Sequence, residues 1–301
     1  MTDRSQLLTE LRLPESMNLD AMSTEDAVAV MNAQDLVAVN AAASARADVV
    51  KAIDLVVAAL SKGGRLFYFG AGTSGRLGVL DASECPPTFR SDPEMVQGVI
   101  AGGNDAMFRA KEGAEDSPEG GSKDVDDRNI GPNDVAIGIA SGGTTPYVHG
   151  ALRRAAERGA KTVFILCVQP FPGEPKTDVT IRLLTGPEAL TGSTRLKAGT
   201  ATKLVLNQIT TIAFVKLGKC YENLMVDLRA TNTKLWDRGS RIVATLTGIN
   251  RDEALSLLGR AEGHVKLAVI MQKRGVDVGE AKQLIVASNG RLREAMAAED
   301  E

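Results

Sequence analysis

Two loops rich in glycine and hydroxyl side chains, each directly after a short apolar run, constrain the fold of this chain most. The run at 65–69 leads into Gly70-Ala-Gly-Thr-Ser-Gly75, and the run at 134–140 leads into Ser141-Gly-Gly-Thr-Thr-Pro146. Short apolar runs that end in glycine are typical of buried strands, and a helix is expected after each loop, from about Arg76 in the first case. Repeated strand–loop–helix units predict a parallel sheet covered by helices on both faces.

Three further apolar runs complete the predicted sheet, at 95–100, 162–168 and 179–184. A helical pattern over 44–61 precedes the first strand, and a long helix is expected over 198–217 after the last. The pattern therefore predicts an α/β fold with a doubly wound, five-stranded parallel sheet of the flavodoxin type.

The ends of the chain differ from this central pattern. We expect a helical lead-in over residues 1–45, the sheet domain over 46–237 and a small all-helical module over 238–301. Within the module, three short helices separated by glycines are expected at 251–262, 264–273 and 277–288.

Composition excludes several function classes. The 301 residues carry 35 Lys plus Arg against 38 Asp plus Glu, a formal net charge of −3, so no bulk basic charge is available for nucleic acid or an anionic membrane surface. Three widely spaced cysteines and two histidines offer no disulfide framework and no metal-ligand spacing. The N-terminal residues lack the apolar segment of a secretory signal. We expect a soluble, cytoplasmic protein without a metal or cofactor.

The first loop has two rival interpretations. Gly70-x-Gly72-x-x-Gly75 matches the dinucleotide fingerprint, but the next strand ends in 99–103 without the carboxylate that would hold a ribose. Hydroxyls beside free N–H groups at a helix N-terminus suit a compact phosphate instead. The alternative, two ordinary strand-to-helix turns, is plausible for one loop and not for both. The hydroxyls concerned are Thr73, Ser74, Ser141, Thr144 and Thr145.

A third cluster lies just before the long predicted helix. Ser193, Arg195 and Lys197 combine a hydroxyl with two cations at a helix start, which is compatible with an anion. A solvated helix cap explains the same residues equally well.

These segments together closely resemble the N-acetylmuramic acid 6-phosphate etherase family of the sugar-isomerase (SIS) superfamily. The most specific segment is Ser83-Glu-Cys-Pro-Pro-Thr-Phe89. Only Leu11-Arg-Leu-Pro14 is looser than the family pattern. The other matching segments are 31–35, 70–78, 100–103, 112–116, 141–146, 191–203 and 223–234.

The resemblance implies a lyase that cleaves the lactyl ether of N-acetylmuramic acid 6-phosphate. The products are N-acetylglucosamine 6-phosphate and D-lactate, formed during recycling of cell-wall amino sugars. The resemblance also implies a homodimer, no metal and a C-terminal module similar to ubiquitin-associated domains.

Family resemblance assigns the proton transfers to glutamates. Glu84 would protonate the departing lactate oxygen and later assist water addition, in a setting where Cys85, Pro86 and Pro87 offer little solvation. Glu115 would be the base at carbon 2, and Glu112 is a candidate sugar contact. The commoner fate of a glutamate is a surface charge. The expected phosphate, sugar or lactyl contacts are Gly72, Thr73, Ser74, Ser141, Thr144, Thr145, Ser193, Arg195 and Lys197.

Other functions remain open at this point. A phosphosugar aldose–ketose isomerase of the same superfamily would use the same phosphate loops and a carboxylate base, but would release no lactate. A sugar-phosphate sensor would bind without turnover, and a nicotinamide dehydrogenase is weakened by the missing ribose carboxylate.

Overall fold

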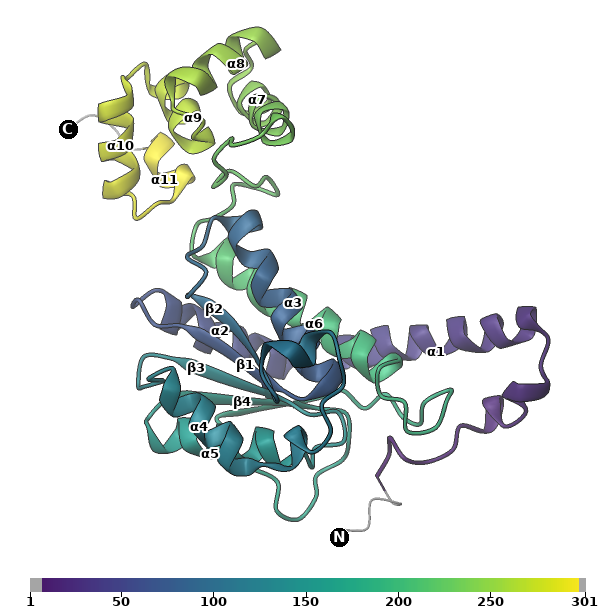
Figure 1. The fold of residues 1–301 in the computed structure, drawn as a ribbon. Helices are drawn as coiled ribbons and strands as arrows, with labels where there is room; N and C mark the ends of the chain where they lie inside the picture. The colour runs from purple at the N-terminus through teal and green to yellow at the C-terminus, as the bar shows by residue number, and fades with distance from the viewer. Residues whose placement is uncertain (1–6, 298–301) are drawn as a thin grey trace. The chain divides into compact units, whose positions relative to one another are not determined.

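The computed structural model describes residues 7–297 (Figure 1). The chain forms two compact units. The first contains the described residues up to Ser83 together with Pro93–Thr210, and the second contains Glu84–Asp92 and the described residues from Thr211 onward.

The first unit is built on the predicted five-stranded parallel sheet, whose strand order is β2-β1-β3-β4-β5. Every neighbouring pair is parallel, and β1 lies between β2 and β3, with Gly70 opposite Ile100 on one side and Ile139 on the other. All five predicted strands are present: β1 Leu66–Gly70, β2 Val96–Ile100, β3 Val135–Ile139, β4 Lys161–Leu166 and β5 Val179–Arg182.

Helices cover both faces of the sheet. Helix α5 contacts β3 and β4, whereas α2 contacts β1, β3 and β5. Helix α3 approaches β1 from the side of Gly78, where an added Cβ would lie 2.7 Å from Tyr68 Cβ. Its start at Gly72 is earlier than expected, because a φ of +53° at this glycine turns the chain straight from β1 into the helix. The helices are α1 Thr24–Ser44, α2 Arg46–Leu60, α3 Gly72–Phe89, α4 Pro118–Asp127, α5 Pro146–Glu157 and α6 Lys197–Lys216, with short 3₁₀ turns at Pro14–Ser16, Leu19–Ala21, Asn104–Met107 and Ala114–Asp116.

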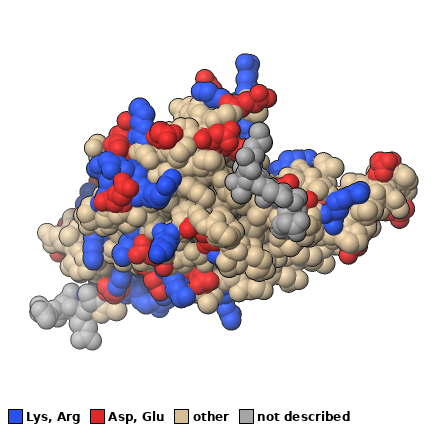
Figure 2. Space-filling model, turned by 90° about the horizontal axis from the view of Figure 1, so that it is seen from below, with Lys and Arg blue, Asp and Glu red and all other residues tan. Residues whose placement is uncertain are grey.

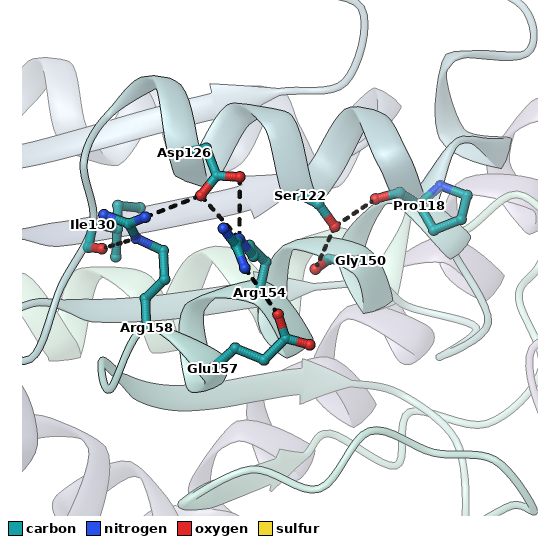
Figure 3. Close-up of polar contacts among 8 residues, drawn as sticks. All are labelled: Pro118, Ser122, Asp126, Ile130, Gly150, Arg154, Glu157 and Arg158. Atoms are coloured by element: carbon teal, nitrogen blue, oxygen red, sulfur yellow. Dashed lines mark hydrogen bonds and ion pairs between the residues drawn. The ribbon is translucent and has the colours of Figure 1, made fainter.

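Helices α4 and α5 pack without space for side chains at their crossing. A Cβ on Gly121 would lie 2.0 Å from the Tyr147 carbonyl oxygen, and one on Gly150 would lie 1.9 Å from that of Pro118. Asp126 of α4 accepts hydrogen bonds from Arg154 and Arg158, and the hydroxyl of Ser122 donates to the carbonyls of Pro118 and Gly150 (Figure 3). The two glycines therefore fix α4 on α5, and the charged pairs hold its outer side.

The second unit is helical around its own apolar core. Capping boxes at Asn250–Glu253 and Asp277–Glu280 start α8 and α10, and Gly275, in the left-handed region, ends α9. Leu258 and Val265 lie in the buried core, against which Trp236 packs. The three expected helices are present and are flanked by two more: α7 Thr233–Thr247, α8 Arg251–Arg260, α9 Val265–Arg274, α10 Val278–Ala287 and α11 Leu292–Ala297.

The domain limits at residues 45 and 237 stay predictions. Residue 45 is the junction between α1 and α2, and residue 237 lies inside α7. Helices α3 and α6 each contribute residues to both compact units.

On the face seen in Figure 2, Lys and Arg side chains are interspersed with Asp and Glu rather than gathered by sign. Among the described residues, no helix combines the length and apolar character that a bilayer crossing requires. In the same part of the chain, no group of three or more His, Cys, Asp or Glu side chains could hold a metal ion.

Candidate functional site

The strand order places its reversal point, where a ligand crevice is expected, at the carboxyl ends of β1 and β3. From β1 the chain crosses over to β2 on one side, and from β3 it crosses over to β4 on the other, so the two loops diverge at adjacent strand ends. In open parallel sheets this reversal point is where ligands bind. Both hydroxyl-rich loops predicted from the sequence begin here.

The first loop is almost entirely helix. Gly72 is exposed, and Thr73 and Ser74 are half-buried in the first turn of α3, where N–H groups have no partner within the helix. A Cβ on Gly70 would lie 2.6 Å from the backbone nitrogen of Gly75, and a Cβ on Gly75 would lie 2.6 Å from the carbonyl oxygen of Gly70. Both positions therefore require glycine. The turn therefore presents backbone donors and two hydroxyls at the crevice, which suits a phosphate.

A cavity of about 160 Å³ adjoins this turn at the carboxyl ends of β1 and β2. Its lining includes Gly72 together with Glu112 and Glu115, so three of the predicted site residues meet here. Glu115 lies in the short turn Ala114–Asp116, which Gly113 begins with a left-handed φ of +73°. Both glutamates are exposed, with room for a ligand beside them.

The second loop is held in shape by its own backbone and by His149. The N–H of Gly143 donates to Ala140, and the Gly143 carbonyl accepts from Nε2 of His149 at 2.6 Å. Burial lowers the pKa of His149, although the bond to Gly143 opposes the shift, and the neutral ring donates this bond with its proton on Nε2. Thr145 is the N-cap of α5, and its side chain makes no capping bond, so its hydroxyl is available to a ligand. Ser141, Thr144 and Thr145 are each half-buried along this loop.

Ser141 also belongs to a buried polar cluster beneath the loop. Its carbonyl accepts from the N–H of Cys167 at 2.8 Å, and its side chain bonds the Cys167 thiol. Burial raises the pKa of that thiol to about 12, so Cys167 is an inert filler rather than a nucleophile.

The third cluster differs from the expectation for Lys197. Its side chain is 2% exposed, and its ammonium donates to the side-chain oxygen of Gln34 in α1 rather than facing the crevice. The carboxylate of Glu188 accepts from the backbone N–H groups of Lys197 and Ala198, at 3.1 and 3.0 Å. The first turn of α6 is therefore neutralised from within the protein.

The rest of that cluster stays accessible. Ser193 is half-buried and Arg195 is exposed. A Cβ on Gly199 would lie 3.6 Å from Cγ2 of Thr73, so the starts of α6 and α3 are neighbours. Ser193 and Arg195 come just before the start of α6, so they can act beside the first loop.

Glu84 lies in α3, three turns beyond the loop hydroxyls, in the part of the helix that belongs to the second compact unit. Of the three residues expected to form an apolar setting, Cys85 is buried, Pro86 is half-buried and Pro87 is exposed. Glu84 itself is exposed in the single chain. The expectation that its carboxyl group is poorly solvated is therefore wrong for the single chain.

Comparison with known proteins bears directly on this arrangement. Residues 48–156 match the glucokinase regulatory protein N-terminal SIS domain, and residues 116–212 match the SIS domain. An N-acetylmuramic acid 6-phosphate etherase from Synechocystis sp. is 52% identical over 298 residues, covering 99% of this chain and 98% of the relative. The etherase from Nostoc punctiforme is 51% identical over 296 residues, covering 98% and 96%.

The chain belongs to the N-acetylmuramic acid 6-phosphate etherase family. Membership confirms the resemblance drawn from the motifs. Among solved structures, the phosphoheptose isomerase GmhA from Neisseria gonorrhoeae aligns with 64% of this chain and 98% of its own, at 19% identity and a TM-score of 0.46.

Two cations of this etherase-family site were missed by sequence reasoning. The Arg76 guanidinium donates to the carbonyls of Ala106 and Met107, at 2.8 and 2.9 Å, and the Lys111 ammonium donates to Gly102 at 3.2 Å. They fold the segment after β2 back onto α3 and so bring its glutamates to Gly72. Arg76 directly follows the glycine loop in the sequence, and this position of a cation beside a predicted phosphate loop could have marked it as a site residue.

Proposed function

We propose that this chain cleaves the D-lactyl ether of N-acetylmuramic acid 6-phosphate, as a carbon–oxygen lyase in the recycling of cell-wall amino sugars. The observation that carries the proposal is the 52% identity to an N-acetylmuramic acid 6-phosphate etherase over nearly the whole of both chains. The products are N-acetylglucosamine 6-phosphate and D-lactate.

The crevice supports the binding of one phosphate. Thr73 and Ser74 at the start of α3, with the N–H groups beside Gly72, would bind the phosphate oxygens. Ser141, Thr144 and Thr145 on the neighbouring loop would bind the phosphate or the sugar hydroxyls.

The reacting bond is an alkyl ether, which becomes labile because it lies beta to the aldehyde of the open-chain sugar. Glu115 removes the proton on carbon 2, which that carbonyl acidifies, and the electron pair forms a double bond between carbons 2 and 3. The carbon 3–oxygen bond breaks as Glu84 protonates the lactyl oxygen. Water then adds at carbon 3, and a proton returns to carbon 2. Each positioned acid or base is worth about 10²–10⁴-fold in rate.

The remaining contacts have supporting roles. Glu112, which lines the same cavity as Glu115, would accept hydrogen bonds from the sugar. Ser193 and Arg195 would bind the phosphate or the lactyl carboxylate. Lys197 would act indirectly, by anchoring α1 on the start of α6 through Gln34.

A homodimer is part of the proposal. Helix α1 is apolar on most sides, yet within its described residues only Ala38 and Ala42 are buried. Leu36 is 66% exposed and Val28 52%, which is unfavourable for an unpartnered helix. Light scattering should therefore give twice the chain mass, and Leu36→Asp should shift the mass toward one chain. A substrate that is a sugar phosphate also favours the cytoplasm as its location.

The deciding experiment is incubation of the purified chain with N-acetylmuramic acid 6-phosphate, coupled to an enzymatic D-lactate readout. Stoichiometric lactate supports the etherase. The competing aldose–ketose isomerase would change the sugar without releasing lactate, and a sensor would bind the phosphosugar and leave it unchanged.

A further inference from the structure

The second compact unit contains a pocket that the proposed reaction does not use. Its volume is about 490 Å³, and all of its lining residues belong to that unit. The floor is apolar and includes Val265, Ile285 and Val286, the last of which is 75% exposed. A concave apolar floor of this size is typical of a site for a small organic molecule.

A cationic edge borders this floor. Arg90, whose backbone lies in the left-handed region at a φ of +50°, donates from Nη1 to Nδ1 of His264 at 2.9 Å. Because a guanidinium can only donate, Nδ1 of His264 must accept, and the ring is then neutral with its proton on Nε2. Lys282 of α10 lines the same pocket.

The charges that face His264 are mostly of one sign. Burial lowers its pKa, and the positive charges of Arg90, Arg229 and Lys282 lower it further, whereas Glu262 acts in the other direction. Glu262 is itself paired with Lys282, at 3.2 Å. An added anion would therefore be attracted to this edge.

The third cation that lines the pocket, Lys266, already has its partners. The Lys266 ammonium donates to the carbonyls of Gly218 and Gly290, at 3.0 and 2.7 Å, and lies 3.3 Å from the Asp227 carboxylate. Lys266 and Asp227 thus belong to the framework of the pocket, and the cations left for a ligand are Arg90, whose other guanidinium nitrogens can still donate, and Lys282, whose pair with Glu262 is solvent-exposed.

We propose that this pocket is a binding site for a small organic anion with an apolar body. The acidic head would lie between Arg90, His264 and Lys282, and the apolar body would lie on Val265, Ile285 and Val286. The site is independent of the etherase reaction, because none of its residues is assigned to substrate.

Histidine NMR offers a direct test, since the chain has two histidines. His149 lies in the first unit, bonded to Gly143, and serves as the internal control. Octanoate and acetate are added separately to the full-length protein while both imidazole signals are followed. We expect octanoate to shift the His264 signal saturably and to raise the pKa of that ring, because a bound anion favours the imidazolium. His149 should not respond.

The comparison of the two probes tests the apolar floor. Octanoate should bind about tenfold or more tightly than acetate, because its extra methylene groups leave water. Equal binding of both carboxylates, or the absence of a saturable shift at His264, would overturn the proposal.

Charge variants test the cationic edge. Arg90→Gln and Lys282→Gln should each weaken octanoate binding at least about fivefold, as expected for the loss of a charged hydrogen bond. Lys273→Gln is the matched control, because this exposed lysine of α9 is outside the pocket and its loss changes the net charge equally. Lys282 is an exposed residue of α10, so Lys282→Gln should leave the fold intact. This variant therefore measures the effect of the charge on octanoate binding even if Arg90→Gln loses structure. If the Lys282 variant binds octanoate as tightly as the Lys273 control, the site is wrong.

Discussion

The phenol of Tyr68, in β1, donates a hydrogen bond of 2.9 Å to the carboxylate of Asp81, in α3. The other carboxylate oxygen accepts from the hydroxyl of Thr210, in α6, at 3.1 Å. Asp81 thus joins the sheet to the two helices whose first turns border the crevice. Burial raises its pKa from 3.8 to about 6, although both hydroxyls and the charge of Lys203 oppose the rise.

This raised pKa predicts that Asp81→Asn stabilises the protein at neutral pH. The folded chain holds the proton more strongly than the unfolded chain, so the contribution of Asp81 is present below pH 3.8 and is lost as the pH rises through about 6. Asparagine carries no charge and escapes this loss, which amounts to at most about 3 kcal/mol at ~1.4 kcal/mol per pKa unit. Urea unfolding of both proteins should give similar midpoints at pH 4 and a higher midpoint for the variant at pH 7.

Tyr68→Phe is the companion variant for that measurement. It removes a bond that favours the ionised carboxylate, so the pKa of Asp81 should rise further and the stability lost between acid and neutral pH should grow. A parallel pH dependence in wild type and both variants would contradict this account of Asp81.

The crossing of α4 and α5 predicts a steric penalty. Gly150→Ala places a Cβ 1.9 Å from the Pro118 carbonyl oxygen, and the two helices must separate to accommodate it, at a cost of about 1–3 kcal/mol. Gly259→Ala is the matched control, because a methyl group added to this glycine in α8 would have nothing within 4 Å. That change should stabilise its helix by about 0.5–1 kcal/mol. Thermal melting of both variants should therefore shift in opposite directions.

For the acid role, Glu84→Gln is expected to lower D-lactate release by about 10²-fold or more, as the loss of a general acid should. Affinity for N-acetylglucosamine 6-phosphate, measured by calorimetry, should change little because the phosphate loops are intact. Turnover close to that of wild type would remove Glu84 from the mechanism.

Elimination followed by water addition also predicts an isotope pattern. Turnover in deuterated water should place deuterium on carbon 2 of N-acetylglucosamine 6-phosphate, detected by mass spectrometry. Glu115→Gln should suppress this exchange together with lactate release. Lactate formed without deuterium at carbon 2 would point to direct displacement at carbon 3.

Arg76 predicts an effect on the site through the segment that it holds. Arg76→Met removes both bonds to the Ala106 and Met107 carbonyls, so Glu112 and Glu115 should lose their fixed position. Steady-state kinetics should show kcat/KM reduced about 10-fold or more, equivalent to ~1.4 kcal/mol in the transition state. Arg109→Met, at an exposed position of the same segment, should leave the kinetics unchanged.

The elements of the sheet were predictable because their apolar runs are short and end in glycine or polar residues. Helix α4 was not expected from the sequence: it contains Gly120 and Gly121, which disfavour an isolated helix. Its formation depends on Tyr147 and Gly150 of α5, to which only glycine allows so close an approach.

The candidate site was predictable where the chain itself brings residues together. Gly72, Thr73 and Ser74 follow a strand directly, so their place at a helix start could be inferred. Lys197 could not be placed in the same way, because its burial depends on Gln34, 163 positions away. A charge in a sequence reveals neither the direction of its side chain nor what already neutralises it.

The carboxylate of Glu188 at the start of α6 has a consequence for selectivity. A helix end that already carries an internal counter-ion has fewer backbone donors left for another anion, so an acidic group of the substrate beside α6 should be bound mainly by the Arg195 side chain. A phosphate, which needs several backbone donors, should therefore bind at the first turn of α3 or α5 and not at that of α6.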